Sequence, residues 1–208
     1  MKLEVVNSKG EKTGRKVELS DDIFGIEPND HVIYLDVKRY LNNQRQGTHK
    51  AKQRNEIHGS TRKIRKQKGG GGARAGSIKN PLFRHGGRIF GPQPRDYTTK
   101  LNKKVKILAR KSALAYKAKE NKIIIVEDFD FEQPRTKSYI DLLKALELNG
   151  TKTLLLLNEN RENVIKSARN LPDTEVNLAN SINTYNILHA TTLLVMEGSI
   201  GSLNENLK

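Results

Sequence analysis

Cysteine is absent from the 208-residue chain, and so are long apolar runs. Without cysteine the chain can form neither a disulfide nor a thiolate metal site. Apolar runs such as Ile123–Val126 are far shorter than the ~20 apolar residues that a membrane-spanning helix needs. The first residues, Met1-Lys2-Leu3-Glu4, carry no apolar segment typical of a signal peptide. We therefore expect a soluble, intracellular protein without a membrane partner.

Acidic residues are nearly absent from one stretch of the chain. Residues 42–104 hold 17 of the 38 lysines and arginines, but Glu56 and Asp96 are their only acids. This stretch therefore accounts for the entire net charge of +15, and the remainder of the chain is balanced. A neutral body with one basic arm indicates a polyanionic partner for that arm.

Regular periodicity is also missing between residue 43 and about residue 99, where ten of the 16 glycines lie. Loops this long are uncommon inside a compact domain and are usually functional or disordered. Hydrophobic residues make up only 35% of the chain, which agrees with a part that does not pack into a core. We expect residues 1–42 and 100–208 to form one globular domain and residues 43–99 to form an extended basic arm.

Outside the arm, short apolar strands alternate with amphipathic helices. Strands are predicted at about 3–6, 16–19, 123–126, 154–157, near 176, and at 193–196, and helices at about 28–42, 101–119, 136–150, 161–169 and 184–189. Apolar strands that alternate with helices are typical of a parallel sheet covered on both faces. The predicted fold class is thus α/β, with a mostly parallel sheet, helices on both faces, and a long basic loop inserted.

Two of these helices carry detailed expectations. In the helix at 101–119, the predicted buried stripe is Leu101, Val105, Leu108, Ser112 and Ala115. In the helix that starts near 136, Thr136 is the predicted cap and Gly150 the predicted end. The inner face of that helix is predicted to consist of Tyr139, Leu142, Leu143 and Leu146.

The residue types in the arm favour RNA as the polyanion. Arginine forks onto phosphate or stacks on bases. The glycines of Gly69-Gly70-Gly71-Gly72 and Gly86-Gly87 let a backbone pass close to other backbones. Phe83, Phe90 and Tyr97 can stack on bases, or they can instead pack against the domain at the base of the arm. The side chains that we predict to contact RNA are Arg45, Lys50, Lys52, Arg54, Arg62, Lys63, Arg65, Lys66, Lys68, Arg74, Lys79, Arg84, Arg88 and Arg95.

Signals for an enzyme are weak. Gly70-x-Gly72-x-x-Ala75 and Gly71-x-x-x-x-Gly76-Ser77 approach two phosphate-binding motifs, but the sequence after each predicts no helix to receive a phosphate. Glu127, Asp128 and Asp130 follow a predicted strand, where open α/β sheets often place active sites. No base or nucleophile accompanies them, so loop solvation is the favoured interpretation. A metal-dependent nucleic-acid enzyme built on these acids stays the alternative, and a basic protein that coats DNA is a third reading.

Linked motifs between Arg45 and Lys104 resemble the bacterial large-subunit ribosomal protein four family, and the resemblance extends over the whole chain. The motifs are Arg45-Gln46-Gly47-Thr48, Gly59-Ser60, Lys66-Gln67-Lys68-Gly69, Ala73-Arg74-x-Gly76-Ser77, Asn80-Pro81, Gly86-Gly87, Pro94-Arg95-Asp96-Tyr97, Lys100-x-Asn102-Lys103-Lys104 and the later Ile123-Ile124-Ile125-Val126-Glu127.

The resemblance implies a structural constituent of the large ribosomal subunit, with no catalytic activity, metal or cofactor. It implies primary binding of 23S rRNA early in assembly, in the cytoplasm. It also implies that the tip of the arm, at Arg62, Lys63, Ile64 and Arg65, lines the peptide exit tunnel beside large-subunit protein twenty-two and the nascent peptide. Many members of the family have Pro-Trp where this chain has Ile64-Arg65, so we expect a tip of different shape and charge.

Overall fold

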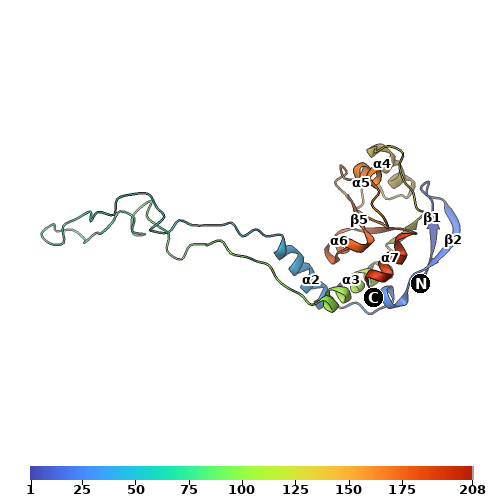
Figure 1. The fold of residues 1–208 in the computed structure, drawn as a ribbon, viewed down its shortest axis with the longest axis horizontal. Helices are drawn as coiled ribbons and strands as arrows, with labels where there is room; N and C mark the ends of the chain where they lie inside the picture. The colour runs from blue at the N-terminus through green and yellow to red at the C-terminus, as the bar shows by residue number, and fades with distance from the viewer. Residues whose placement is uncertain (208) are drawn as a thin grey trace. The chain divides into compact units, whose positions relative to one another are not determined.

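The computed structural model describes residues 1–207, which form two units (Figure 1). One unit combines Met1–Leu41 with the chain from Lys100 onward, and the other is Asn42–Thr99. The first unit contains all the strands in the described part of the chain. In that part, no helix is both long enough and apolar enough to cross a membrane.

A six-stranded sheet forms the centre of the first unit, in the order β2-β1-β3-β6-β4-β5. The strands are β1 (Lys2–Val6), β2 (Lys12–Glu18), β3 (Ile123–Val126), β4 (Thr153–Leu157), β5 (Thr174–Leu178) and β6 (Thr192–Met196). Edge strand β2 runs antiparallel to β1, and all other neighbours are parallel. The prediction of a mostly parallel sheet is therefore confirmed.

The burial of each strand explains how clearly its sequence predicts it. Every residue of β4 and β6 is buried, because both strands lie inside the sheet and are covered on both faces. Edge strand β5 is half-buried throughout, and edge strand β2 is mostly exposed and charged. The interior strands therefore read as continuous apolar runs, whereas the edge strands give a weak sequence signal.

Helices cover both faces of the sheet, as predicted. One face packs against α1 (Asp21–Phe24), α3 (Lys103–Lys119), α6 (Thr184–His189) and α7 (Ser199–Asn206), through a core that includes Ile125, Leu154 and Leu193. The opposite face packs against α4 (Thr136–Ala145) and α5 (Glu162–Ala168), through a core that includes Leu155 and Leu194. Alternate residues of the same strand thus serve the two cores.

Helix α2 (Asp30–Asn43) leads from the first unit into the second and is tied to the first by a buried carboxylate. Asp36 is 1% exposed, and it accepts hydrogen bonds from Thr184 Oγ1 (2.6 Å) and from Arg39 Nε (2.8 Å). A buried carboxylate requires such partners, because an unpaired one would be costly to desolvate. Helix α2 is therefore anchored to α6 within the first unit. The 3₁₀ helix η1 (Ala179–Ser181) precedes α6.

Three helix expectations were wrong in detail. Leu108 is 40% exposed, because α3 turns another face, which includes Ala113 and Ala118, toward the sheet. Thr136 is the first helical residue of α4 rather than its cap, and that helix ends at Ala145, well before Gly150. By contrast, the predicted inner face of α4 is confirmed, with Tyr139, Leu142 and Leu143 buried and Leu146 packed at the margin of the same core.

Candidate nucleic-acid interface

The unit Asn42–Thr99 consists of two extended limbs without helix or strand beyond the end of α2 (teal and green in Figure 1). Isolated hydrogen bonds join the limbs, in place of a continuous β-ladder. They run from Arg95 N to Gly47 O (3.3 Å), from Ala51 N to Pro92 O (2.9 Å), from Arg88 N to Lys52 O (2.9 Å) and from Ile64 N to Gly76 O (3.0 Å). The chain therefore goes out and returns alongside itself, and most of its peptide groups stay available to a partner.

Glycine is required where the limbs approach most closely. A Cβ on Gly87 would lie 2.4 Å from Arg54 N, and one on Gly47 would lie 2.0 Å from Arg95 O. Real Cβ atoms do not approach other atoms so closely, so any side chain there would push the limbs apart. The expected close passage of backbones is thus confirmed at Gly87. It is not found at Gly69–Gly71, where an added Cβ would meet nothing within 4 Å.

The predicted RNA contacts are nearly all available to solvent. Of the fourteen arginines and lysines, only Lys79 is half-buried, and the other thirteen are exposed. Within residues 1–207, Lys50 is the only one of them in an ion pair, with its Nζ 2.7 Å from Glu56 Oε1. The arm therefore offers a dense set of uncompensated positive charges along both limbs, which is the electrostatic pattern of a phosphate-binding surface.

Both acids of the arm are engaged within it. Glu56 accepts hydrogen bonds from Lys50 and from Gln53 N, and these two interactions lower the pKa of its carboxyl. Asp96 accepts the hydroxyl (2.6 Å) and the backbone N–H (2.8 Å) of Thr98, which likewise lower its pKa. Both groups stay ionised at neutral pH. Asp96 shapes a local turn, whereas Glu56 cancels one positive charge of the arm.

The three arm aromatics have different surroundings. Two guanidinium groups lie over the ring of Tyr97, with Arg45 Cζ at 3.8 Å and Arg95 Cζ at 4.7 Å from its centroid. These cation–π contacts hold two predicted RNA contacts at one place, where Arg95 N also bonds the opposite limb. Phe83 is only partly exposed, but Phe90 is exposed completely.

At the tip, side chains make local contacts within the arm. Ile64 is 48% exposed, and its N–H reaches across to the return limb. Lys63 bonds to the side chain of Gln67, and Arg65 Nη1 donates to Ala73 O at 3.4 Å. Arg62, Lys63, Ile64 and Arg65 are all exposed. The tip thus presents three cations and one aliphatic side chain.

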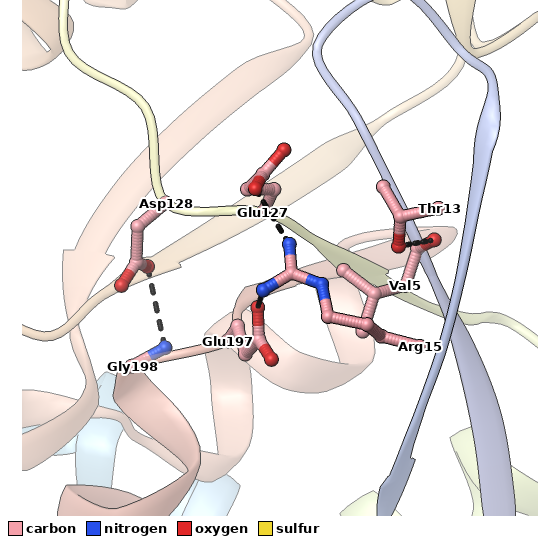
Figure 2. Close-up of polar contacts among 7 residues, drawn as sticks. All are labelled: Val5, Thr13, Arg15, Glu127, Asp128, Glu197 and Gly198. Carbon is pink, nitrogen blue, oxygen red and sulfur yellow. Dashed lines mark hydrogen bonds and ion pairs between the residues drawn. The ribbon is translucent and has the colours of Figure 1, made fainter.

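The carboxyl ends of β3 and β6 are where an active site of an open α/β sheet is expected. The chain leaves these neighbouring strands toward opposite faces, to α4 and to α7, which makes this edge a topological switch point. Figure 2 shows Arg15 of β2 lying between two glutamates there. Its Nη2 is 2.5 Å from Glu127 Oε1, and its Nη1 is 3.2 Å from Glu197 Oε2. Arg15 therefore offsets part of the negative charge at these strand ends and joins β2 to them.

The neighbouring acids have structural partners. Asp128 accepts the N–H of Gly198 (3.2 Å) at the start of α7, as Figure 2 shows, and Asp130 accepts the N–H of Phe131 (2.8 Å). Within residues 1–207, no three histidine or acidic side chains are grouped to hold a metal ion. The glycine motifs lie in the arm, and no helix follows them before α3. The pairing of Arg15 with Glu127 spans 112 residues of sequence, so no local pattern could have predicted it.

Comparison with known proteins is consistent with this arrangement. Residues 17–206 match the model of the ribosomal protein L4/L1 family. The chain is 59% identical over 203 residues to the large ribosomal subunit protein uL4 of Phocaeicola vulgatus, with 98% of each chain covered. It is 58% identical to the uL4 proteins of Flavobacterium psychrophilum (100% of this chain, 99% of the relative) and Parabacteroides distasonis (100% of both).

Proposed function

Because the chain belongs to the ribosomal protein L4/L1 family, it is a structural, non-enzymatic constituent of the large ribosomal subunit, and we propose that it binds 23S rRNA directly. In this proposal it is a primary binder that acts early in assembly of the subunit on cytoplasmic ribosomes. Its work is to hold segments of RNA in place by many weak contacts. No single lysine or arginine is expected to be indispensable.

The two units are proposed to divide this work. Residues 1–42 and 100–208 provide a folded anchor with two hydrophobic cores, and residues 43–99 provide the rRNA-binding arm. The arm's exposed and uncompensated cations are the observation that supports its role. Each cation that neutralises a phosphate releases condensed counterions. If about eight phosphates are neutralised, log K falls with log salt at a slope of about −6 to −7.

Deletion of residues 50–90 tests this division. The variant is expected to lose most of its affinity for 23S rRNA in filter binding, while circular dichroism and thermal unfolding show a folded body. A deletion variant that binds as tightly as the full chain would contradict the proposal. Duplex DNA is the matched competitor: equal affinity for DNA and folded rRNA would favour a protein that coats nucleic acids without selection.

The tip of the arm is proposed to line the peptide exit tunnel beside large-subunit protein twenty-two. Three exposed cations and Ile64 would then face the nascent peptide, where many family members carry Pro-Trp. A photoreactive amino acid at position 64 tests this placement in translating ribosomes. Cross-links to the nascent chain are expected, and cross-links confined to solvent-side proteins would contradict it. The same substitution at Tyr34, a 56% exposed residue of α2, is the control.

A further inference from the structure

Phe90 is the most exposed large apolar residue in the described chain, with a relative exposure of 103%. Its backbone has φ of +53°, in the left-handed region that bulky residues rarely adopt. Such a conformation persists only where the surrounding structure imposes it, and it is often associated with function. Phe90 thus combines a strained backbone with a side chain that packs against no other part of the described chain. A binding partner outside the chain would account for both features.

The bulge that carries Phe90 is built by an unequal residue count between the limbs. Arg88 N bonds to Lys52 O, and Ala51 N bonds to Pro92 O, both at 2.9 Å. Ala51 and Lys52 are consecutive, whereas three residues, 89–91, separate Arg88 from Pro92. These three residues have no counterpart on the outgoing limb, so they bulge out.

Glycine at position 91 keeps this bulge close to the other limb. A Cβ there would lie 2.6 Å from the Cβ of Ala51 and 2.7 Å from Arg88 Cγ. The bulge therefore rests on the outgoing limb through Gly91, and the side chain of Phe90 is left in solvent. Two hydrogen bonds and one close glycine contact thus fix the position from which the ring extends.

Three cations line the hollow that Phe90 also lines. Phe90 lines a hollow of about 970 Å³ together with Arg54, Lys79 and Arg88, and no acidic residue contributes to its lining. An aromatic face beside several cations matches a nucleotide, whose base stacks on the ring while its phosphates contact the charges. Tyr97 differs, because two arginines already lie over its ring.

We propose that Phe90 is a stacking platform for an unpaired base of RNA, and that Arg54, Lys79 and Arg88 receive the neighbouring phosphates. This inference rests on the proposed rRNA binding and adds a site at which a base is held. The three cations that line the same hollow favour a nucleotide over an apolar pocket of a neighbouring protein.

Substitutions at Phe90 test the proposal in the full chain with 23S rRNA. Phe90→Ala is expected to weaken binding about 5- to 150-fold, the range that corresponds to loss of one base stack. Phe90→Asn should weaken it similarly, although asparagine tolerates the left-handed backbone. Phe90→Leu should also weaken binding, whereas Phe90→Tyr should retain it. Leu82→Ala is the matched control, since Leu82 is an arm residue exposed to 87% and should bind as the wild type does.

Fluorescence gives a second readout, because the chain contains no tryptophan. In Phe90→Trp the fluorescence of the single indole should be quenched when rRNA is added, and in Leu82→Trp it should be little changed.

If the wild type fails to bind rRNA, the proposed function itself is wrong. If the wild type binds and Phe90→Ala or Phe90→Leu binds equally well, only the stacking proposal is wrong. If Phe90→Ala reduced incorporation into the subunit but left binding to naked rRNA unchanged, the stacking proposal would also be wrong. Phe90 would then bind a pocket on a neighbouring protein.

Discussion

Replacement of Glu56 by glutamine is expected to strengthen binding to rRNA and to make it more salt-dependent. In the free chain, Glu56 forms an ion pair with Lys50 at 2.7 Å, so this lysine is not available to bind a phosphate. Glutamine retains an oxygen that can accept the N–H of Gln53, so the local turn is kept. The released Lys50 can then neutralise one further phosphate.

The size of the effect follows from counterion release. One more neutralised phosphate steepens the slope of log K against log salt by about 0.7 to 0.9. Between 1 M and 0.1 M salt this corresponds to a gain of about five- to eightfold in affinity over the wild type. Filter binding to 23S rRNA at four or more salt concentrations measures both quantities. Asp96→Asn is the control, because Asp96 accepts hydrogen bonds from Thr98 and pairs with no cation in residues 1–207. A Glu56→Gln slope equal to that of the wild type would refute this reasoning.

Three further substitutions test the fold and the limbs. Tyr139→Phe should leave the stability unchanged or raise it by up to ~1 kcal/mol in denaturant unfolding, because the buried Tyr139 hydroxyl has no partner in the described chain. Burial raises the pKa of Tyr139, so the wild type should lose stability as pH rises above about 10, where the unfolded tyrosine ionises, and the phenylalanine variant should lose less. Arg15→Gln should lower the melting temperature only slightly, since the ion pairs of Arg15 are half-exposed, and a large loss would contradict that. Gly87→Ala should weaken rRNA binding in a gel-shift assay while the melting temperature of the body stays constant, because the added Cβ forces the limbs apart; unchanged binding would show that the limbs separate freely.

Much of the fold was predictable because its signals are local. The interior strands are continuous apolar runs, such as Leu154–Leu157, and their burial on both faces follows directly from that pattern. The predicted buried stripe of α3 was wrong at Leu108, because helical spacing identifies an apolar stripe but not which of its residues the sheet will touch. Lys117 shows the same limit: it is buried, and its Nζ donates to Ala190 O at 2.8 Å, a contact between distant segments.

For the candidate site, charge could be predicted from sequence and geometry could not. The count of lysines and arginines identified the arm, and their exposure agrees with that prediction. The sequence did not predict which residues of the two limbs pair, because that depends on which residues lie opposite one another across the arm. The bulge at Phe90 therefore had no signal beyond its aromatic residue and the glycine that follows. Arg15 was missed for the same reason, since its partners Glu127 and Glu197 come from distant strands.

A density map of the large ribosomal subunit that contains this chain would test the central claim most directly. We expect both limbs of the arm, from residue 45 to residue 95, to lie within hydrogen-bond distance of rRNA phosphates at about eight or more lysines and arginines. A map in which the limbs extend into solvent, while only the globular unit touches rRNA, would contradict the account.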